Sequence, residues 1–338
     1  MPYAAISIAF AGPLTSRSGR RDPRIAVALG DPRGIGPEIT ARALAQPLAA
    51  DVVLIGAEDQ IAALPAAGHV SVGIWGLGTG EANSDHARAR RAGRIAGNAV
   101  ETAARMALSG EVDAIVTAPA HKHTLQLAGF PYPGHTEWLA HLAGDVDVAM
   151  MLAAEGARDG GPTLRVVLVT THVPFRDVAA LLTVHRVVRT GRVVQNALQN
   201  WWGLDRPRLA LCALNPHAGE SGLFGDEEAR VLQPAATALE ATGPLPADTV
   251  FVRAMRGEFD AVLAPYHDVG MTAIKVAAFG RAVNVTLGLP FPRTSPDHGT
   301  AFDIAGSGRA DWSSMRAALE VAVHLAAKNR AVRPALQP

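Results

Sequence analysis

Three histidines in this chain each follow a short apolar run. His172 comes after VVLVTT, His217 after LCALNP and His267 after AVLAPY, at spacings of 45 and 50 residues. Such runs are typical of strands buried on both faces of a parallel sheet, and ligands collect beyond the carboxyl ends of those strands. Three imidazoles at one edge could bind a divalent metal and leave positions open for substrate or water. The spacing matches no short zinc motif, and strand-end histidines are also common loop residues, so both interpretations stay open.

Further polar residues cluster at glycine-rich turns. GHTE, at 134–137, reads as the start of a helix whose histidine is either a ligand or incidental. The segment 284–310 holds several glycines together with Arg293 and His298, and long loops of this composition are usually functional. The planar fork of Arg293 suits a carboxylate or phosphate, and Lys275 offers a compact positive charge. Alternatively, Arg293 and Lys275 each form an ordinary surface ion pair.

Short apolar runs alternate with amphipathic stretches along the chain. Helical patterns cover 36–48, with Pro37 in the first turn, and 86–110, closed by Gly110. The alternation predicts βα units, an α/β fold and a mostly parallel sheet. No linker is visible, so a second domain would be built by the chain crossing out and back. The predicted strands lie at 24–31, 51–59, 112–119, 164–172, 208–217 and 259–267.

Composition describes an ordinary globular protein. Of 338 residues, 49% are hydrophobic and 18% charged, and the formal net charge is zero, which gives no electrostatic reason to expect a nucleic acid or a membrane as partner. The single cysteine, Cys212, lies in an apolar run and reads as a buried packing thiol. We expect a cytoplasmic protein in which residues 1–23 form a mobile extension. Neither the GxGxxG dinucleotide fingerprint nor a Walker lysine motif occurs.

Seven motifs together resemble the 4-hydroxythreonine-4-phosphate dehydrogenase family of pyridoxal phosphate biosynthesis. They occur in the family's order and cover about residues 24–330. DHGTAFDIAG is also similar to a loop of the isocitrate and isopropylmalate dehydrogenases, in which that loop holds the adenosine end of the nicotinamide cofactor. The motifs are ALGDPRGIGPEI, YPGHTEWLA, TTHVP, LNPHAGESGLFGDEE, GPLPADTVF, YHDVGMTAIK and GLPFPRTSPDHGTAFDIAGSGRA.

The resemblance implies an α/β/α subunit, similar in fold to the isocitrate and isopropylmalate dehydrogenases. It would form one catalytic unit over 24–330, with two subdomains interleaved in sequence, a cleft between them and a short tail at 331–338. It also implies a homodimer whose subunits both contribute to each active site. The implied metal ligands, for zinc, magnesium, cobalt or a similar ion, are His172, His217 and His267. The implied substrate contacts are His135, Thr136, Lys275, Asn284 and Arg293, with Lys275 also catalytic. The implied cofactor contacts are His298, Gly299 and Asp303.

The implied reaction is metal-dependent oxidation of 4-phosphooxy-threonine by NAD or NADP. The product is a β-keto acid that loses carbon dioxide to give 3-amino-2-oxopropyl phosphate. Some paralogues act on four-carbon sugar-acid phosphates or on aromatic dicarboxylate dihydrodiols, and the dihydrodiol branch tends to lose GHTE. Here the chain departs from the family's usual residues at Arg33, His121, His123 and Val269, which leaves the exact substrate open. Two alternatives to a dehydrogenase are a mononuclear metal hydrolase and a non-catalytic small-molecule binder.

Overall fold

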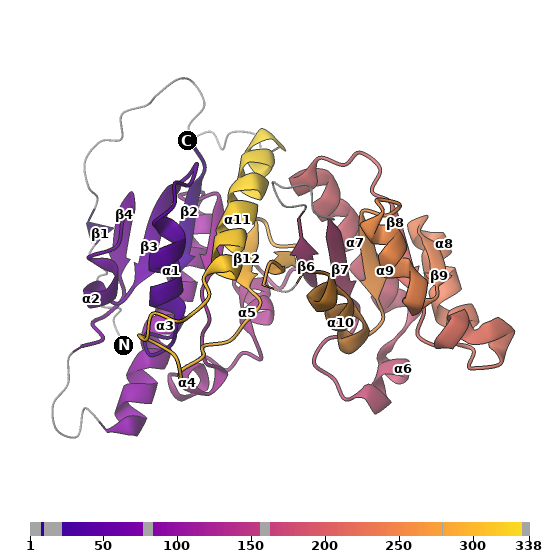
Figure 1. Ribbon diagram of the computed structural model, residues 1–338, viewed down its shortest axis with the longest axis horizontal. Helices are drawn as coiled ribbons and strands as arrows, with labels where there is room; N and C mark the ends of the chain where they lie inside the picture. Colours follow the sequence, from indigo (N-terminus) through magenta and orange to yellow (C-terminus); the bar gives the residue numbers. More distant parts are fainter. Residues whose placement is uncertain (1–7, 10–21, 77–83, 156–162, 279, 333–338) are drawn as a thin grey trace. The chain divides into compact units, whose positions relative to one another are not determined.

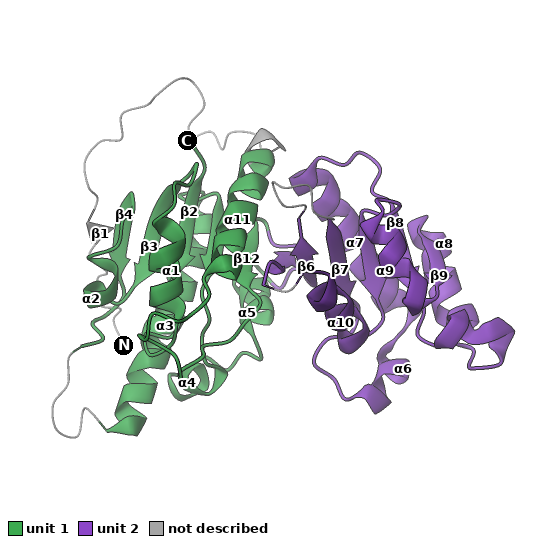
Figure 2. Cartoon of the chain, in the orientation of Figure 1, with its two compact units in different colours: residues 1–144, 290–338 green, residues 145–289 purple. Residues whose placement is uncertain are grey.

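The computed structural model describes residues 8–9, 22–76, 84–155, 163–278 and 280–332. The chain divides into two units, shown in different colours in Figure 2. Unit 1 comprises residues 1–144 and 290–338, and unit 2 comprises residues 145–289. The chain therefore leaves unit 1 once and returns once, and both of its ends belong to the same unit.

Unit 1 is built on a sheet with strand order β1-β4-β3-β2-β5-β12. Pairing is parallel from β4 to β12, and only the short β1 runs antiparallel to its neighbour. The middle strands consist almost wholly of buried Ile, Val, Leu and Ala, as expected of a parallel sheet covered on both faces. The strands are β1 (Ile8–Ala9), β2 (Arg24–Ala28), β3 (Asp51–Gly56), β4 (Gly68–Ser71), β5 (Ala114–Thr117) and β12 (Arg293–Pro296).

The helices of unit 1 begin and end largely where the sequence predicts. Pro37 lies in the first turn of α1, and α3 starts after the Ser84 cap and is followed by Gly110 with φ 80°. Helix α11 packs against α1, β5 and β12, whereas α3 packs against β2, β3 and β5 (Figure 1). The helices are α1 (Gly36–Leu44), α2 (Glu58–Ile61), α3 (Asp85–Leu108), α4 (Lys122–Leu127), α5 (His135–Leu142) and α11 (Ser313–Val332).

Unit 2 has the strand order β11-β6-β7-β10-β8-β9. Strands β7, β10 and β8 are parallel, as predicted. Strands β9, β6 and β11 were not predicted: β9 runs parallel to β8, whereas β6 runs antiparallel to both β7 and β11. The sequence does not reveal this because an apolar run has no alternation that would distinguish the two directions. The strands are β6 (Ala149–Ala154), β7 (Leu164–Leu168), β8 (Leu209–Cys212), β9 (Thr242–Leu245), β10 (Ala261–Ala264) and β11 (Val283–Leu287).

The helical stretch predicted after β7 is interrupted in the structure. Leu182 is extended, and the Thr183 hydroxyl then caps α7 by accepting a hydrogen bond from the backbone N–H of Arg186 at 3.2 Å. In Figure 1, α9 and α10 lie in front of the unit 2 strands and α7 lies behind them. The helices are α6 (Val178–Leu181), α7 (Val184–Trp202), α8 (Gln233–Leu239), α9 (Ala247–Met255) and α10 (His267–Ala278), with short 3-10 or π turns at Phe175–Asp177, Pro216–Gly222 and Glu228–Leu232.

The glycine-rich segment 284–310, predicted to be rich in loops, also contains most of β11 and all of β12. The predicted N-terminal extension lies mainly outside the described residues, although Ile8–Ala9 pairs with β4.

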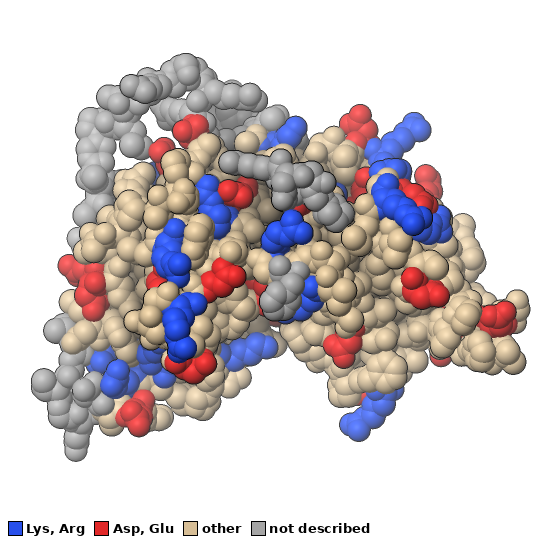
Figure 3. Space-filling model, viewed as in Figure 1, with Lys and Arg blue, Asp and Glu red and all other residues tan. Residues whose placement is uncertain are grey.

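The charges on the surface are mixed, as the zero formal net charge leads us to expect. On the face in Figure 3, Lys and Arg are interspersed with Asp and Glu. Among the described residues, no helix is long and apolar enough to cross a membrane.

Candidate active site

Three adjacent parallel strands of unit 2 precede the predicted metal ligands. Strand β10 pairs in parallel with β7 on one side and with β8 on the other. His172 follows β7, His217 follows β8, and His267 begins α10 just after β10. Parallel neighbours present their carboxyl ends at the same edge, so the topology brings all three histidines to one edge of the unit 2 sheet.

Two of these histidines lie close together. The ring centroids of His172 and His267 are 5.5 Å apart, and both residues line a concavity of about 140 Å³. Nδ1 of His267 lies 2.6 Å from Oδ1 of Asp268. In the tautomer that donates from Nδ1 to this carboxylate, the lone pair of the ring is on Nε2. A neutral imidazole oriented by a carboxylate in this way is the usual form of a metal-binding histidine.

His217 lies on a left-handed turn of the backbone. Residues 217–221 all have φ between 42° and 81°. The His217 side chain is 70% exposed, and its Nδ1 lies 3.8 Å from Oε2 of Glu220. Within the described ranges, no three His, Cys, Asp or Glu side chains are arranged to hold a metal ion. One chain therefore brings two of the three predicted donors together, and a site shared by all three stays a prediction.

Glu228 anchors the turn that carries His217, and sequence analysis missed it. Its buried carboxylate accepts hydrogen bonds from the backbone N–H groups of Leu214 and Asn215 at 3.0 and 2.8 Å. The side-chain amide of Asn215 also donates to it, at 2.9 Å. Left-handed non-glycine residues persist only where their surroundings hold them. The run of acidic residues in GDEE, shortly after a strand-end histidine, is the sequence feature that could have indicated Glu228.

Lys275 and Asn284 are the other predicted ligand residues of unit 2. Lys275 lies on α10, which packs so closely on β7 that a Cβ at Gly270 would come within 2.7 Å of Leu168 Cδ2. Eight residues separate Lys275 from His267, which is roughly 12 Å along a helix axis. Both residues could contact one extended ligand. Asn284 lies on β11, and its Oδ1 is buried with no hydrogen-bond partner among the described residues.

In unit 1, Arg293 is held at the end of a buried strand pair. It is the first residue of β12, is only 4% exposed, and donates from Nε and Nη2 to the hydroxyl of Thr117 at 3.2 and 2.7 Å. Burial lowers the pKa of Arg293 to about 10, and the carboxylate of Glu137 opposes that shift. The guanidinium is therefore still charged at neutral pH. Thr117 is a second residue that the sequence did not indicate.

His135 and Thr136 open α5, beside this arginine. The helix is fixed by Trp138, which is buried and stacks on Tyr132 at a centroid distance of 5.2 Å. Nε2 of His135 is buried and has no hydrogen-bond partner among the described residues. Burial, together with smaller contributions from the positive charges of Arg293 and Lys122, lowers the pKa of His135 to about 3. A neutral imidazole beside a charged, buried guanidinium is well suited to bind an anion.

The three predicted cofactor contacts lie in one loop of unit 1, which follows β12. Nε2 of His298 is buried without a hydrogen-bond partner among the described residues. A Cβ added at Gly299 would meet nothing within 4 Å, and Asp303 is exposed. Buried polar atoms without partners are rare in native proteins and are expected where a ligand completes the bonding. The loop therefore fits a polar ligand such as a nucleotide.

The sequence expectation for Cys212 is confirmed. The side chain is fully buried in β8 and packs in the apolar core of unit 2. Burial raises the pKa of the Cys212 thiol to about 12, with a smaller contribution from Glu228. A thiol with this pKa is not a nucleophile at neutral pH.

Comparisons with known proteins show which family the chain belongs to. A family model described as "Pyridoxal phosphate biosynthetic protein PdxA" matches residues 44–322. The 4-hydroxythreonine-4-phosphate dehydrogenase of Geobacter metallireducens is 42% identical, over 90% of this chain and 96% of that protein. The crystal structure of the corresponding enzyme from Klebsiella pneumoniae has a TM-score of 0.76 and 40% identity, and covers 90% of this chain and 99% of its own.

A second solved structure is less similar. It is a terephthalate 1,2-cis-dihydrodiol dehydrogenase from Burkholderia xenovorans, with a TM-score of 0.62 and 30% identity over 89% of this chain and 98% of its own. The family match, the extent of the identity and the shared α/β fold point the same way. The chain belongs to the 4-hydroxythreonine-4-phosphate dehydrogenase family of oxidoreductases, as its motifs predicted.

Proposed function

We propose that the chain oxidises 4-phosphooxy-threonine with NAD or NADP and releases carbon dioxide from the resulting β-keto acid. The observation that carries this proposal is charged Arg293 close to neutral His135, whose buried Nε2 has no hydrogen-bond partner among the described residues. A buried guanidinium provides a planar fork for phosphate or carboxylate oxygens. Thr136, in the first turn of the same helix, offers a further hydroxyl donor.

The residues of unit 2 supply the reacting end of the chemistry. Asn284, with an unpaired buried oxygen, would accept a hydrogen bond from an N–H or O–H group of the substrate. The nicotinamide, when bound, would supply the hydride acceptor, and Lys275 would be the group that takes up the hydroxyl proton of the substrate. The β-keto acid then loses carbon dioxide, and a proton replaces it to give 3-amino-2-oxopropyl phosphate.

The strand-end histidines are the proposed metal ligands. His172, His217 and His267 would hold a divalent ion such as zinc, magnesium or cobalt, which supplies Lewis-acid polarisation of the substrate oxygen. The lone pair left on Nε2 of His267 supports this assignment, and so does the proximity of His172.

A homodimer would complete this site. Large apolar side chains are exposed near the proposed ligand residues: Leu223 is 72% exposed after the His217 turn, and Val276 is 82% exposed beside Lys275. Contact surfaces bury exposed apolar side chains of this kind where several lie together. Both features support a second copy of the chain as the partner.

Mixed dimers test the shared site. His217→Ala and His267→Ala homodimers should each be inactive, and an exchanged mixture should recover activity, because one of the two sites in a mixed dimer receives all three histidines. Light scattering of each variant serves as the control for dimerisation. Failure of exchanged mixed dimers to recover any activity would show that one subunit supplies both residues.

The activity itself is tested by following reduced-nicotinamide absorbance. Metal-loaded protein is offered 4-phosphooxy-threonine, four-carbon sugar-acid phosphates and an aromatic-diacid dihydrodiol, each with NAD and with NADP. Turnover of the first compound, abolished by a chelator, is the expected result. Absence of turnover with all of them would favour the metal-hydrolase or binder reading.

A dihydrodiol dehydrogenase is the second candidate, because the Burkholderia xenovorans structure with that activity has the same fold. Retention of GHTE, which places His135 and Thr136 next to Arg293, favours the phosphorylated substrate. Turnover of the dihydrodiol alone would reverse this order.

A further inference from the structure

Two segments of unit 1 that are far apart in sequence meet closely: the turn 31–36 and the loop 298–310. The backbone N–H of Ile35 donates to the carbonyl of Thr300 at 3.0 Å. A Cβ at Gly34 would come within 2.8 Å of the same carbonyl, so only glycine allows this approach. The first half of the loop is thus docked on the turn.

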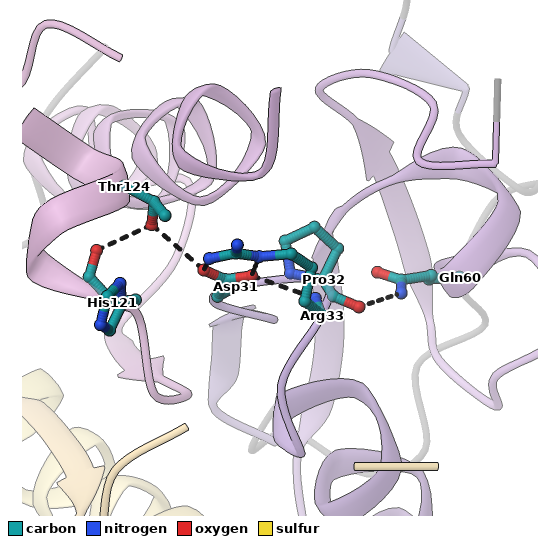
Figure 4. Close-up of polar contacts among 6 residues, drawn as sticks. All are labelled: Asp31, Pro32, Arg33, Gln60, His121 and Thr124. Atoms are coloured by element: carbon teal, nitrogen blue, oxygen red, sulfur yellow. Dashed lines mark hydrogen bonds and ion pairs between the residues drawn. The ribbon is translucent and has the colours of Figure 1, made fainter. Parts of the chain in front are cut away.

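Arg33 is fixed within that turn by Asp31. The guanidinium donates from Nε to Oδ1 at 3.0 Å and from Nη2 to Oδ2 at 2.8 Å, while Asp31 is fully buried. Figure 4 shows the guanidinium against the carboxylate, and Thr124 donating to Oδ2 from α4 at 3.1 Å. A two-point contact of this kind sets the plane of the guanidinium as well as its position.

The fixed guanidinium covers the ring of Phe302. The Cζ of Arg33 lies 4.8 Å from the centroid of that ring, within the range of a cation–π contact. The His121 ring approaches the same phenyl at 5.3 Å and an interplanar angle of 66°. Phe302 follows Ala301, whose φ of 40° is unfavourable for a residue with a Cβ and needs support from its neighbours.

The second half of the loop has separate anchors. The backbone N–H of Gly306 donates to Oε2 of Glu38 at 2.8 Å, and Nη1 of Arg42 donates to the carbonyl of Ala310 at 2.9 Å. These contacts do not reach the part of the loop that carries His298 and Asp303.

We propose that Arg33 is a positioning residue that, with Phe302 and His121, clips the first half of the loop 298–310 in the conformation that receives the nicotinamide cofactor. This inference rests on the proposed NAD- or NADP-dependent function and on the prediction that His298, Gly299 and Asp303 of this loop contact the cofactor. Ordering the loop before binding removes an entropic cost from the cofactor's affinity.

Hydrogen–deuterium exchange on the protein without cofactor tests the clip itself. Arg33→Ala should accelerate exchange in peptides covering 298–305 and leave those of α11 unchanged. Arg88→Ala is the matched control, because Arg88 also lies over an aromatic ring, that of Trp75, at 5.6 Å, and should not alter exchange in the loop. Unchanged exchange in Arg33→Ala would overturn the clip.

Cofactor dissociation constants, measured by calorimetry for NAD and NADP without substrate, test its consequence. Loss of the cation–π contact should weaken binding of the preferred cofactor by about tenfold. Phe302→Leu should weaken it comparably, and the double variant should be no worse than Arg33→Ala alone. Additive losses would mean that the two residues act separately, against the proposal. Arg33→Lys, which keeps the charge but not the fork, should recover only part of the affinity and serves if the alanine variant does not fold.

Faster exchange with unchanged cofactor affinity would overturn the link between clip and cofactor while leaving the substrate panel as an independent test of the reaction. The kinetic signature expected of a positioning role is a raised KM for the cofactor with the substrate KM unchanged.

Discussion

The two groups of proposed ligand residues differ in what holds them. In unit 1, Arg293 is buried against Thr117, and His135 keeps a neutral ring whose Nε2 is enclosed. In unit 2, His172 is exposed and His217 is 70% exposed on a left-handed turn.

The contrast separates two ways of building a site. The unit 1 group is positioned by the chain alone, so it is ready to bind an anion at little further cost. The unit 2 group is brought to one sheet edge but is not closed, and we expect a metal and a second subunit to complete it. Removing residues from each group should therefore have different consequences.

The largest effect is expected from His217→Ala. The variant should lose bound metal. Mutating a residue that only hydrogen-bonds to a metal ligand reduces activity by up to about 100-fold, so loss of a ligand itself should reduce activity by more than that. Its melting temperature should hardly change, since the side chain is mostly exposed. Metal content by mass spectrometry and thermal unfolding check this, with exposed His185→Ala in the same unit as control. Wild-type activity in His217→Ala would refute the metal assignment.

Arg293→Ala should act on substrate binding and on stability together. The KM for the phosphorylated substrate should rise by about 10- to 100-fold, the value of hydrogen bonds to a charged group, with the cofactor KM little changed. Arg165→Ala is the control, because Arg165 is also largely buried and pairs with Glu155 at 2.7 Å but lies outside the proposed site. An unchanged substrate KM would remove Arg293 from the pocket.

The buried imidazole makes stability depend on pH. The folded-state pKa of His135, about 3, is below the unfolded value of 6.5, so the unfolded chain binds the proton first as pH falls. The stabilising contribution is complete above pH 6.5 and is lost progressively down to about pH 3. Denaturant unfolding should show that His135→Gln loses less stability than the parent, by at most about 2 kcal/mol between pH 6.5 and about pH 5. An equal loss would mean that the ring is not shielded; exposed His86→Gln is the control.

The smallest effect should come from Cys212→Ala. Loss of one buried sulfur should cost about 1 kcal/mol of unfolding free energy. Metal content should stay unchanged, because Cys212 is buried in β8 whereas His217, the predicted ligand, lies on the exposed turn that follows. The parent thiol, with its pKa raised to about 12 by burial, should react with a disulfide reagent only after unfolding. Fast reaction in the native protein would contradict the burial of Cys212.

Elements whose pattern is local were predictable from the sequence. The apolar runs of β7, β8 and β10 and the cap signals of α1 and α3 appear where their composition places them. The break at Leu182–Thr183 and the antiparallel direction of β6 were not, because periodicity reports burial and not direction or the geometry of one turn.

The family, the βα order and the positions of His172, His217 and His267 at strand ends could be predicted from the amino-acid sequence, since a buried parallel strand has a recognisable composition. Which side chains meet depends on the folded chain. The hydroxyl of Thr117 holds a guanidinium 176 residues later in the chain, and Thr124 contacts a carboxylate 93 residues earlier. A local pattern records whether a residue is buried, but hydrogen bonds, desolvation and pKa depend on the particular neighbours that folding supplies.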